Sequence, residues 1–397
     1  MKKRSPAFLP SPTPMLALSG IAVAAVLFFA GCASFAGGAP RPAPIVIGAV
    51  GPFSGDLAKF GLATKKAYQM AVEERNAAGG ILGRPLKLVF ADDRGDPKVG
   101  AAAFARLIQK EGVVALLGSV TSKVSLEGAA LAQAAGIPMI SPTSSNPQVT
   151  KTGNFVFRAC VIDPYQGRAG AEFAYGELKV RKAAVLFASD DEATKPLADA
   201  FKARFTALGG KIPVFVGYTR DTSDLKPFVE KALAAKPDLL YLPDYANWVA
   251  SIMAQARELG FKGLFLGGDG WDITEVVATE GKAMEGGYFT KHFSPADTRP
   301  AVVDFAARYK ARYGLEVDQM EALAYDAITL MADAIAKAGS TDGKAVRDAL
   351  AASDRELVSG RFRFDSGRDP VKSVAVFKIS GGAAVYWKTQ APPASPK

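Results

Sequence analysis

The chain alternates short apolar runs with longer segments in which apolar residues recur every three or four positions. Buried strands and amphipathic helices produce these two patterns, and their alternation predicts parallel sheets flanked by helices. In the first half, strands are predicted at 45–50, 86–91, 113–117 and 137–141, and helices at 58–78, 98–110 and 122–135.

The same pattern restarts at residue 183 and predicts a second sheet. Its strands are expected at 183–187, 214–216, 238–242 and 264–266, with helices at 194–208, 224–235 and 246–260. Helices at 301–313, 321–338 and 343–351 follow, and short strands at 361–364, 374–379 and 384–387 end the pattern. The chain of 397 residues exceeds one ordinary core. We therefore expect an α/β fold of two doubly wound parallel-sheet lobes, joined by a hinge, with a ligand cleft between them.

Hydroxyl side chains gather after two successive predicted strands between residues 115 and 147. Ser122 is placed to begin a helix, and Ser144 and Ser145 follow the next strand. Ligands of parallel sheets bind at the carboxyl ends of the strands, and a helix N-terminus attracts anions. The pattern favours a pocket for a small anion; the alternative is that each serine is an N-cap or a turn former.

Asp269 lies in a glycine-rich turn directly after a predicted strand. Glycines let a backbone approach a ligand closely, and a carboxylate there can pair with an ammonium group. The alternative is a capping or turn aspartate. Phe60, Tyr165 and Tyr245 fall in or near predicted loops at strand ends, where they could contact a ligand or pack in the core.

The first 31 residues differ from the rest of the chain. A basic start at residues 2–4 precedes an apolar run, Met15–Ala30, that is short for a membrane span but suits a signal peptide. The sequence Phe29-Ala-Gly-Cys32 is similar to the lipobox of bacterial lipoproteins. We expect a lipoprotein signal peptide at 1–31, lipidation of Cys32, a flexible tether at 32–44 and a periplasmic protein anchored to a membrane. Ordinary secretion is the alternative.

Several function classes are disfavoured by composition. The formal net charge of +9 is modest, and basic residues do not form blocks interleaved with aromatics, which argues against nucleic acid as a partner. His292 is the only histidine, which argues against histidine-dependent catalysis and histidine metal sites. No phosphate-binding loop motif is present, and the spacing of Gly48, Gly51 and Gly55 does not match a dinucleotide fingerprint.

We therefore expect no enzyme activity, no cofactor and no metal. We also expect Cys160 to be a buried, unpaired thiol.

A set of motifs carries a family resemblance over residues 45–387. They are Ile47-Gly-Ala-Val-Gly-Pro-Phe-Ser-Gly55, Asn76-Ala-Ala-Gly-Gly-Ile81, Asp92-Asp-Arg-Gly-Asp-Pro97, Gly136-Ile-Pro-Met-Ile-Ser-Pro142 with Asn146-Pro147, Arg158 with Asp163 and Gln166-Gly167, and Ala324-Tyr-Asp-Ala327. Together they resemble the substrate-binding proteins of bacterial branched-chain amino acid ABC transporters, the leucine/isoleucine/valine group of type I periplasmic binding proteins.

The resemblance implies two lobes, 45–162 plus 290–365 and 163–289 plus 366–389, followed by a disordered tail at 390–397. The lobes would close around an amino acid and deliver it to an ABC permease, and we expect a monomer. The α-carboxylate would be held by Ser122, Ser144 and Ser145, and the α-ammonium by Asp269 and Tyr245. Phe60 would line the ligand's side chain, and Tyr165 occupies a position that often reaches the ligand.

Departures from the family leave the ligand open. Asp269 stands where well-known members carry Glu, Ser145 replaces a threonine, Lys123 replaces a small polar residue, and the family's first-lobe disulfide has no counterpart. Related proteins bind amides or aromatic acids in place of amino acids. Two other classes also remain open: a sensor of the same fold that signals to a partner protein, and an exported enzyme on the same scaffold.

Overall fold

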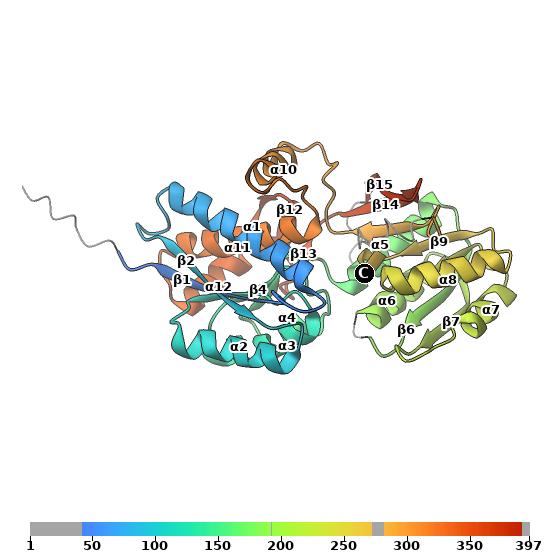
Figure 1. The fold of residues 1–397 in the computed structure, drawn as a ribbon, viewed down its shortest axis with the longest axis horizontal. Coiled ribbons are helices and arrows are strands. Elements are labelled where there is room, and N and C mark those ends of the chain that lie inside the picture. The colour runs from blue at the N-terminus through green and yellow to red at the C-terminus, as the bar shows by residue number, and fades with distance from the viewer. Residues whose placement is uncertain (1–41, 192, 272–281, 391–397) are drawn as a thin grey trace, which may run out of the picture. The chain divides into compact units, whose positions relative to one another are not determined.

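The computed structural model describes residues 42–191, 193–271 and 282–390. The predicted signal peptide, Cys32, nearly all of the tether and the tail after residue 390 lie outside these described residues. Helices and strands alternate along the described chain, as Figure 1 shows. Among the residues that the structure describes, no helix is long and apolar enough to cross a membrane.

The first sheet has five parallel strands in the order β2-β1-β3-β4-β5. Successive side chains of a strand point to opposite faces. In β1, Ile45, Ile47 and Ala49 therefore pack in one core, whereas Val50 packs in the other. The strands are β1 (Ile45–Gly51), β2 (Leu86–Asp92), β3 (Ala115–Leu117), β4 (Met139–Ser141) and β5 (Val156–Arg158).

Helices cover both faces of this sheet. Side chains of α1 and α11 pack on one face and those of α2 and α3 on the other, on either side of β1 in Figure 1. Local signals fix several helix ends: the Asp96 carboxylate accepts bonds from two N–H groups at the start of α2, and Gly136 ends α3 in the left-handed conformation. The helices are α1 (Ala58–Ala77), α2 (Pro97–Lys110), α3 (Ser122–Ala135), α4 (Gln148–Lys151), α10 (Pro300–Tyr313), α11 (Gln319–Ala338) and α12 (Gly343–Ala351).

The second sheet has the order β15-β14-β10-β9-β8-β6-β7, in which β14 pairs antiparallel with both β15 and β10 and the other pairs are parallel. Its strands are β6 (Lys182–Ala188), β7 (Lys211–Tyr218), β8 (Leu239–Tyr241), β9 (Leu264–Gly267), β10 (Tyr288–Lys291), β14 (Val374–Ser380) and β15 (Ala383–Gln390). Two apolar cores, one on each face, contain side chains of its helices. These are α5 (Asp163–Glu172) with a π-helical turn η1 (Phe173–Glu177), α6 (Thr194–Ala207), α7 (Lys226–Ala234), α8 (Ala246–Glu258) and a 3₁₀ turn η2 (Asp269–Trp271).

The chain passes between the two sheets at three places. It leaves the first sheet between β5 and α5, leaves the second after β10, and returns to it through a small antiparallel sheet before β14. That small sheet consists of β11 (Asp354–Leu357), β12 (Gly360–Phe364) and β13 (Pro370–Val371). Thr290 and Lys291, assigned from sequence to the first lobe, belong to β10 of the second sheet.

The predicted α/β fold with two sheets is confirmed, and the helices from α1 to α3 start and end within one residue of the expected limits. Sequence reasoning missed β5, α5 and β10. Phe60 and Tyr165, expected in or near loops at strand ends, lie in the first turns of α1 and α5. Tyr245 is the N-cap of α8, as expected for a residue at a strand end.

Candidate ligand-binding site

The two predicted hydroxyl clusters meet at the carboxyl edge of the first sheet, because β3 and β4 are neighbours. The Ser119 carbonyl accepts hydrogen bonds from the hydroxyls of Ser141, at 2.8 Å, and Ser144, at 3.3 Å. Ser144 also donates to the hydroxyl of Ser125, at 2.8 Å, and all four residues are buried. The Ser144 side chain thus stabilises the loops of this edge, and its contact with a ligand stays a prediction.

Ser122 is the first residue of α3, as predicted, although Thr121 takes the N-cap position. Thr121 makes no side-chain cap bond, and its buried hydroxyl has no partner within the described part of the chain. The Ser122 hydroxyl accepts a bond from the Asn146 N–H at 3.2 Å, and an accepting hydroxyl still has its own proton to donate. The start of α3 therefore combines backbone N–H groups with a hydroxyl, an arrangement suited to a carboxylate.

Ser145 lies where the chain crosses toward the second sheet. Its carbonyl accepts a bond from the Asp163 N–H at 3.1 Å, and its hydroxyl bonds to the Asp163 carboxyl group. Burial raises the pKa of Asp163 well above its usual value, and the bond from Ser145 lowers it only in part. Ser145 is partly exposed, and its contact with a ligand stays a prediction.

A buried arginine supports this loop from behind. Arg158 is fully buried, and its guanidinium donates to the Ser144 carbonyl at 2.5 Å and to the Thr150 hydroxyl at 2.9 Å. Its Nε lies 2.8 Å from an Asp369 carboxylate oxygen, which also accepts from Thr150 at 2.9 Å. The hydroxyl loop is therefore fixed to the third chain crossing by two hydrogen bonds from Arg158, an ion pair between Arg158 and Asp369, and the hydrogen bond from Thr150 to Asp369.

Asp269 follows β9 in the second sheet, and strand register places it beside His292. Gly267 of β9 pairs with Phe289 of the parallel strand β10, so the residues just beyond each strand meet at the same edge. His292 Nε2 lies 2.9 Å from one carboxylate oxygen of Asp269, and Gln166 Nε2 donates to the other at 3.1 Å. The Asp269 side chain remains 26% exposed. It is thus held from two sides while still open to a partner.

The pKa of Asp269 is shifted in the opposite direction from the pKa of Asp163, an acidic group near it. Burial alone would raise its pKa, but the nearby His292 and the hydrogen bonds from His292 and Gln166 hold the pKa of Asp269 below its usual value. Burial raises the pKa of Asp163, and the charges of Asp269 and Asp191 raise it further. Asp269 is therefore the carboxylate of this group that is best kept ionised.

Tyr245 packs beside the Asp269 turn. A side chain at Gly270 would place its Cβ 2.8 Å from the Asp244 carbonyl oxygen and 3.2 Å from the Tyr245 ring, so the backbone contact with Asp244 favours glycine here. The ring is 41% exposed and lies 5.2 Å from the guanidinium of Arg220, which pairs with Asp244 at 2.6 Å. The structure thus brings Tyr245 and Asp269 together, as the resemblance implies.

The other two predicted aromatics lie elsewhere. Tyr165 is buried, and its hydroxyl donates to the Lys372 carbonyl, which ties α5 to the third crossing. Phe60 is partly buried at the start of α1, with the Lys59 ammonium 5.2 Å from its ring centre. Ligand contact by either residue stays a prediction.

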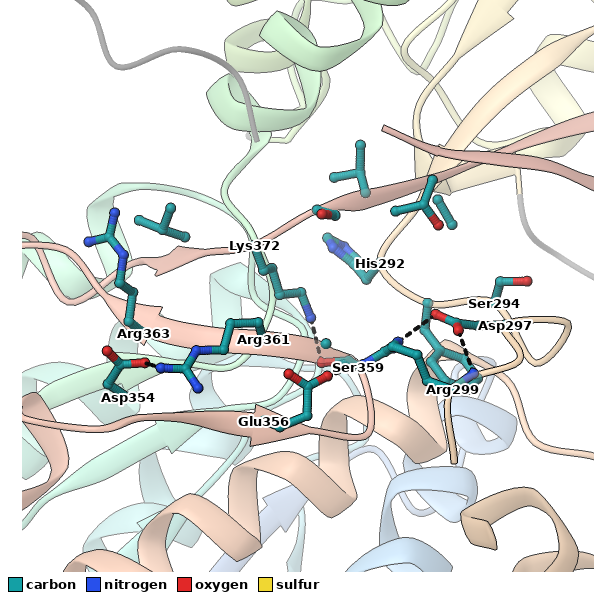
Figure 2. Close-up of a pocket in the computed structure, with 17 residues that line it drawn as sticks. His292, Ser294, Asp297, Arg299, Asp354, Glu356, Ser359, Arg361, Arg363 and Lys372 are labelled. Atoms are coloured by element: carbon teal, nitrogen blue, oxygen red, sulfur yellow. Dashed lines mark hydrogen bonds and ion pairs between the residues drawn. The ribbon is translucent and has the colours of Figure 1, made fainter. Parts of the chain in front are cut away.

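A polar cavity of about 900 Å³ lies at the second and third crossings (Figure 2). His292 is in its wall, and Lys372 points toward Ser359, to whose hydroxyl it donates at 2.6 Å. Burial lowers the pKa of Lys372 to about 8. Arg299 and Arg361 in this cavity are paired with acidic neighbours.

Cys160 is fully buried, as predicted, and burial raises the pKa of its thiol to about 12. In the described ranges, His, Cys, Asp and Glu side chains form no group of three or more that could hold a metal ion.

Sequence reasoning missed the role of Gln166 and His292 as partners of Asp269. Gln166 stood out only as part of a family motif, and His292 only as the single histidine. The Thr290 hydroxyl donates to Gln166 Oε1 at 2.9 Å and so directs the Gln166 amide group toward Asp269. These contacts join α5, η2 and β10, two of which were absent from the prediction.

Comparison with known proteins points the same way. The sequence model of a family described as "Periplasmic binding protein" matches residues 44–384. The chain is 33% identical over 329 residues to "Leu/Ile/Val-binding protein homolog 3" of Brucella melitensis, covering 83% of this chain and 86% of that protein.

Two solved structures are also similar. The leucine binding protein LivK of Thermotoga maritima is 35% identical, with a TM-score of 0.80, and the match covers 88% of this chain and 99% of that one. LivJ of Streptococcus pneumoniae, solved in complex with isoleucine, is 29% identical, with a TM-score of 0.77 and coverage of 87% and 99%.

Proposed function

This chain belongs to the periplasmic binding protein family, and from that membership we propose that it is the substrate-binding protein of an ABC transporter for branched-chain amino acids. It captures leucine, isoleucine or valine and delivers the amino acid to a permease for uptake. The names of the Brucella relative and of the Thermotoga and Streptococcus structures support this choice of ligand.

The observation that carries the proposal is the Asp269 carboxylate. Its pKa is held low, it is partly exposed, and each of its oxygens already accepts one bond from a neutral or cationic donor. A carboxylate has about four lone-pair positions, so two remain for a ligand. An α-ammonium group suits such a site, whereas the carboxylate of an aromatic acid would be repelled.

The opposite end of the amino acid would be bound by the first lobe. The start of α3 supplies N–H groups and the Ser122 hydroxyl, and Ser145 supplies a second hydroxyl after β4. A zwitterion thus has a partner of opposite polarity on each lobe. Apolar burial of the side chain, with Phe60 as the proposed wall, would select branched aliphatic ligands.

Hinge closure would then follow from binding to both lobes. A ligand shifts a protein toward the closed form only as far as it binds that form more tightly. Micromolar affinity needs about 8 kcal/mol net. Charge-assisted hydrogen bonds of about 1.5–3 kcal/mol each, together with apolar burial, are sufficient once the entropy of binding is offset.

Membership of this family implies an extracytoplasmic location and a binding function. We further propose that Cys32 carries a lipid that holds the protein at the membrane, that the protein works as a monomer, and that it does not chemically change its ligand. The basic residues 2–4, the apolar run Met15–Ala30 and Phe29-Ala-Gly-Cys32 support the lipid anchor.

Isothermal titration calorimetry with L-leucine, L-isoleucine and L-valine tests the function. We expect micromolar or tighter binding of at least one of them. Benzoate and 4-methylpentanoate, which is leucine without its amino group, serve as controls and should bind far more weakly. Binding of benzoate with no response to any amino acid would contradict the proposal.

A further inference from the structure

Arg220 lies in the loop after β7 and pairs with two carboxylates from other loops. Its Nη2 is 2.6 Å from Asp244 Oδ1 and 3.3 Å from Asp191 Oδ2. Asp191 follows β6 and Asp244 follows β8, and both of these strands run parallel to their neighbours in the second sheet. One guanidinium therefore joins three loops at the carboxyl edge of this sheet, the edge on which Asp269 follows β9.

The Asp244 carboxylate connects Arg220 to the backbone of Tyr245. The oxygen that pairs with Arg220 also accepts a hydrogen bond from the Tyr245 N–H at 2.7 Å. The other oxygen accepts a bond from the Tyr218 hydroxyl, and the Asp244 side chain is fully buried. Because Tyr245 is the N-cap of α8, these bonds fix the point at which the helix begins. A buried carboxylate needs its cation, so Arg220 is required for this arrangement.

The ring of Tyr245 is held by the same guanidinium. Arg220 Cζ lies 5.2 Å from the ring centre of Tyr245 and 5.3 Å from that of Trp248, in the first turn of α8. Trp248 stacks on Tyr218, with the ring centres 5.7 Å apart and the planes at 20°. A guanidinium within about 6 Å of an aromatic ring centre is attracted to the ring. One cation thus fixes both backbone and ring of Tyr245, which remains 41% exposed.

We propose that Arg220 is a positioning residue for the ligand site, which acts by holding Tyr245 beside Asp269. The Tyr245 ring packs against Gly270, the residue after Asp269, and its hydroxyl is within electrostatic range of the Asp269 carboxylate. An ammonium group bound at Asp269 therefore lies next to Tyr245. This inference rests on the proposed ammonium site and adds the residue that sets the position of one of its walls.

Charge alone predicts the opposite effect of removing Arg220. A cation near the proposed site repels an ammonium group, and its loss leaves Asp191 and Asp244 without their partner. A purely electrostatic role therefore predicts that an uncharged side chain at position 220 leaves ammonium binding equal or tighter. A positioning role predicts weaker binding, so the sign of the change separates the two roles.

A double-mutant cycle measured by calorimetry with L-leucine tests the proposal. We expect Arg220→Met to weaken leucine binding about tenfold, and Tyr245→Ala to weaken it by at least as much. Arg220→Met should cause no further loss when it is added to Tyr245→Ala, because Arg220 acts through Tyr245. Arg220→Lys keeps the charge but has no planar guanidinium to lie against both rings and both carboxylates, so it should also weaken binding.

Arg257→Met is the matched control. The Arg257 guanidinium lies 4.5 Å from the ring centre of Phe265 and donates to the Phe261 carbonyl at 2.6 Å, at the other end of α8. Leucine affinity in this variant should stay within about twofold of wild type, because a distant site acts independently. Circular dichroism identifies the variants that fold, and Arg220→Lys replaces Arg220→Met in the cycle if the latter does not.

The outcomes separate this inference from the proposed function. Equal or tighter leucine binding in the Arg220 variants, or a full second loss in the Tyr245→Ala background, would overturn the role of Arg220 alone. Wild-type affinity in Tyr245→Ala would overturn it as well and leave leucine binding intact. A wild-type protein that binds leucine, isoleucine and valine no better than 4-methylpentanoate would overturn the proposed function, and this inference with it.

Discussion

Arg158 offers a direct test of how the hydroxyl loop is supported. Replacing it with Met keeps much of the side-chain volume but leaves the Ser144 carbonyl and the Thr150 hydroxyl without a donor and the Asp369 carboxylate without its cation. Two hydrogen bonds and an ion pair would sum to more, but such losses are not additive within one network. Breaking a buried ion pair by removing one partner costs about 3–5 kcal/mol, and we expect Arg158→Met to fall in this range.

The assay is urea unfolding followed by circular dichroism and tryptophan fluorescence, with a matched control. Arg106 also pairs with a carboxylate, that of Glu111 at 2.7 Å, but 44% of its side chain is exposed. Arg106→Met should therefore lose no more than about 1 kcal/mol. Equal losses in the two variants would refute the reasoning that burial makes the Arg158 network strong.

The pH dependence of the Arg158→Met loss gives a second check. Burial raises the pKa of Asp369, and Arg158 lowers it in part. Without Arg158 the folded-state pKa of Asp369 rises further above its unfolded value, so the ionised carboxylate destabilises the fold at neutral pH. This penalty is relieved as pH falls through the folded-state pKa. The difference in unfolding free energy between wild type and Arg158→Met should shrink from about pH 8 to pH 5, and a constant difference would contradict this account.

Three further outcomes are expected. Ser122→Ala combined with Ser145→Ala should weaken L-leucine about tenfold or more in calorimetry and leucinamide by less, and equal losses would argue against a carboxylate at this edge. Tyr165→Phe should lower the unfolding free energy by about 0.5–1.5 kcal/mol, because the Lys372 carbonyl loses its donor; an unchanged thermal unfolding curve would show that the bond contributes nothing. Cys32→Ser should move the protein from the membrane to the soluble fraction and abolish fatty-acid labelling, whereas retention at the membrane would exclude the lipid anchor.

Much of the fold could be predicted because its signals are local. The short apolar run of β1 and the Asp96-Pro97 start of α2 each involve residues close in sequence. α5 was missed because Asp163-Pro-Tyr-Gln-Gly-Arg-Ala-Gly170 has the composition of a turn. In the structure, Gly167 serves packing instead: a Cβ there would lie 2.5 Å from the Leu197 carbonyl oxygen of α6. Tertiary contact stabilises this segment as a helix, and its local helix signal is limited to the Asp163-Pro164 start.

The positions of candidate residues that directly follow strands could also be predicted from the sequence. Parallel topology sends every residue after a strand to one edge, so Ser122, Ser145 and Asp269 reached the predicted edges without knowledge of their partners. What their side chains do there depends on contacts between distant segments. Ser144 is an example that sequence reasoning could not resolve. Its hydroxyl bonds to the Ser119 carbonyl and the Ser125 hydroxyl, both of which come from another segment of the chain.

The role of His292 was hidden by one missed strand. β10 is four residues long, buried along its whole length, and contains Thr290 and Lys291, so it lacks both the alternation and the apolar run by which strands are recognised. Without β10 there is no register to place the residue after it beside the residue after β9. From the sequence alone, a single histidine argues only against histidine-dependent catalysis and histidine metal sites. With the register known, the same histidine is seen to be a direct partner of Asp269, with its Nε2 2.9 Å from a carboxylate oxygen.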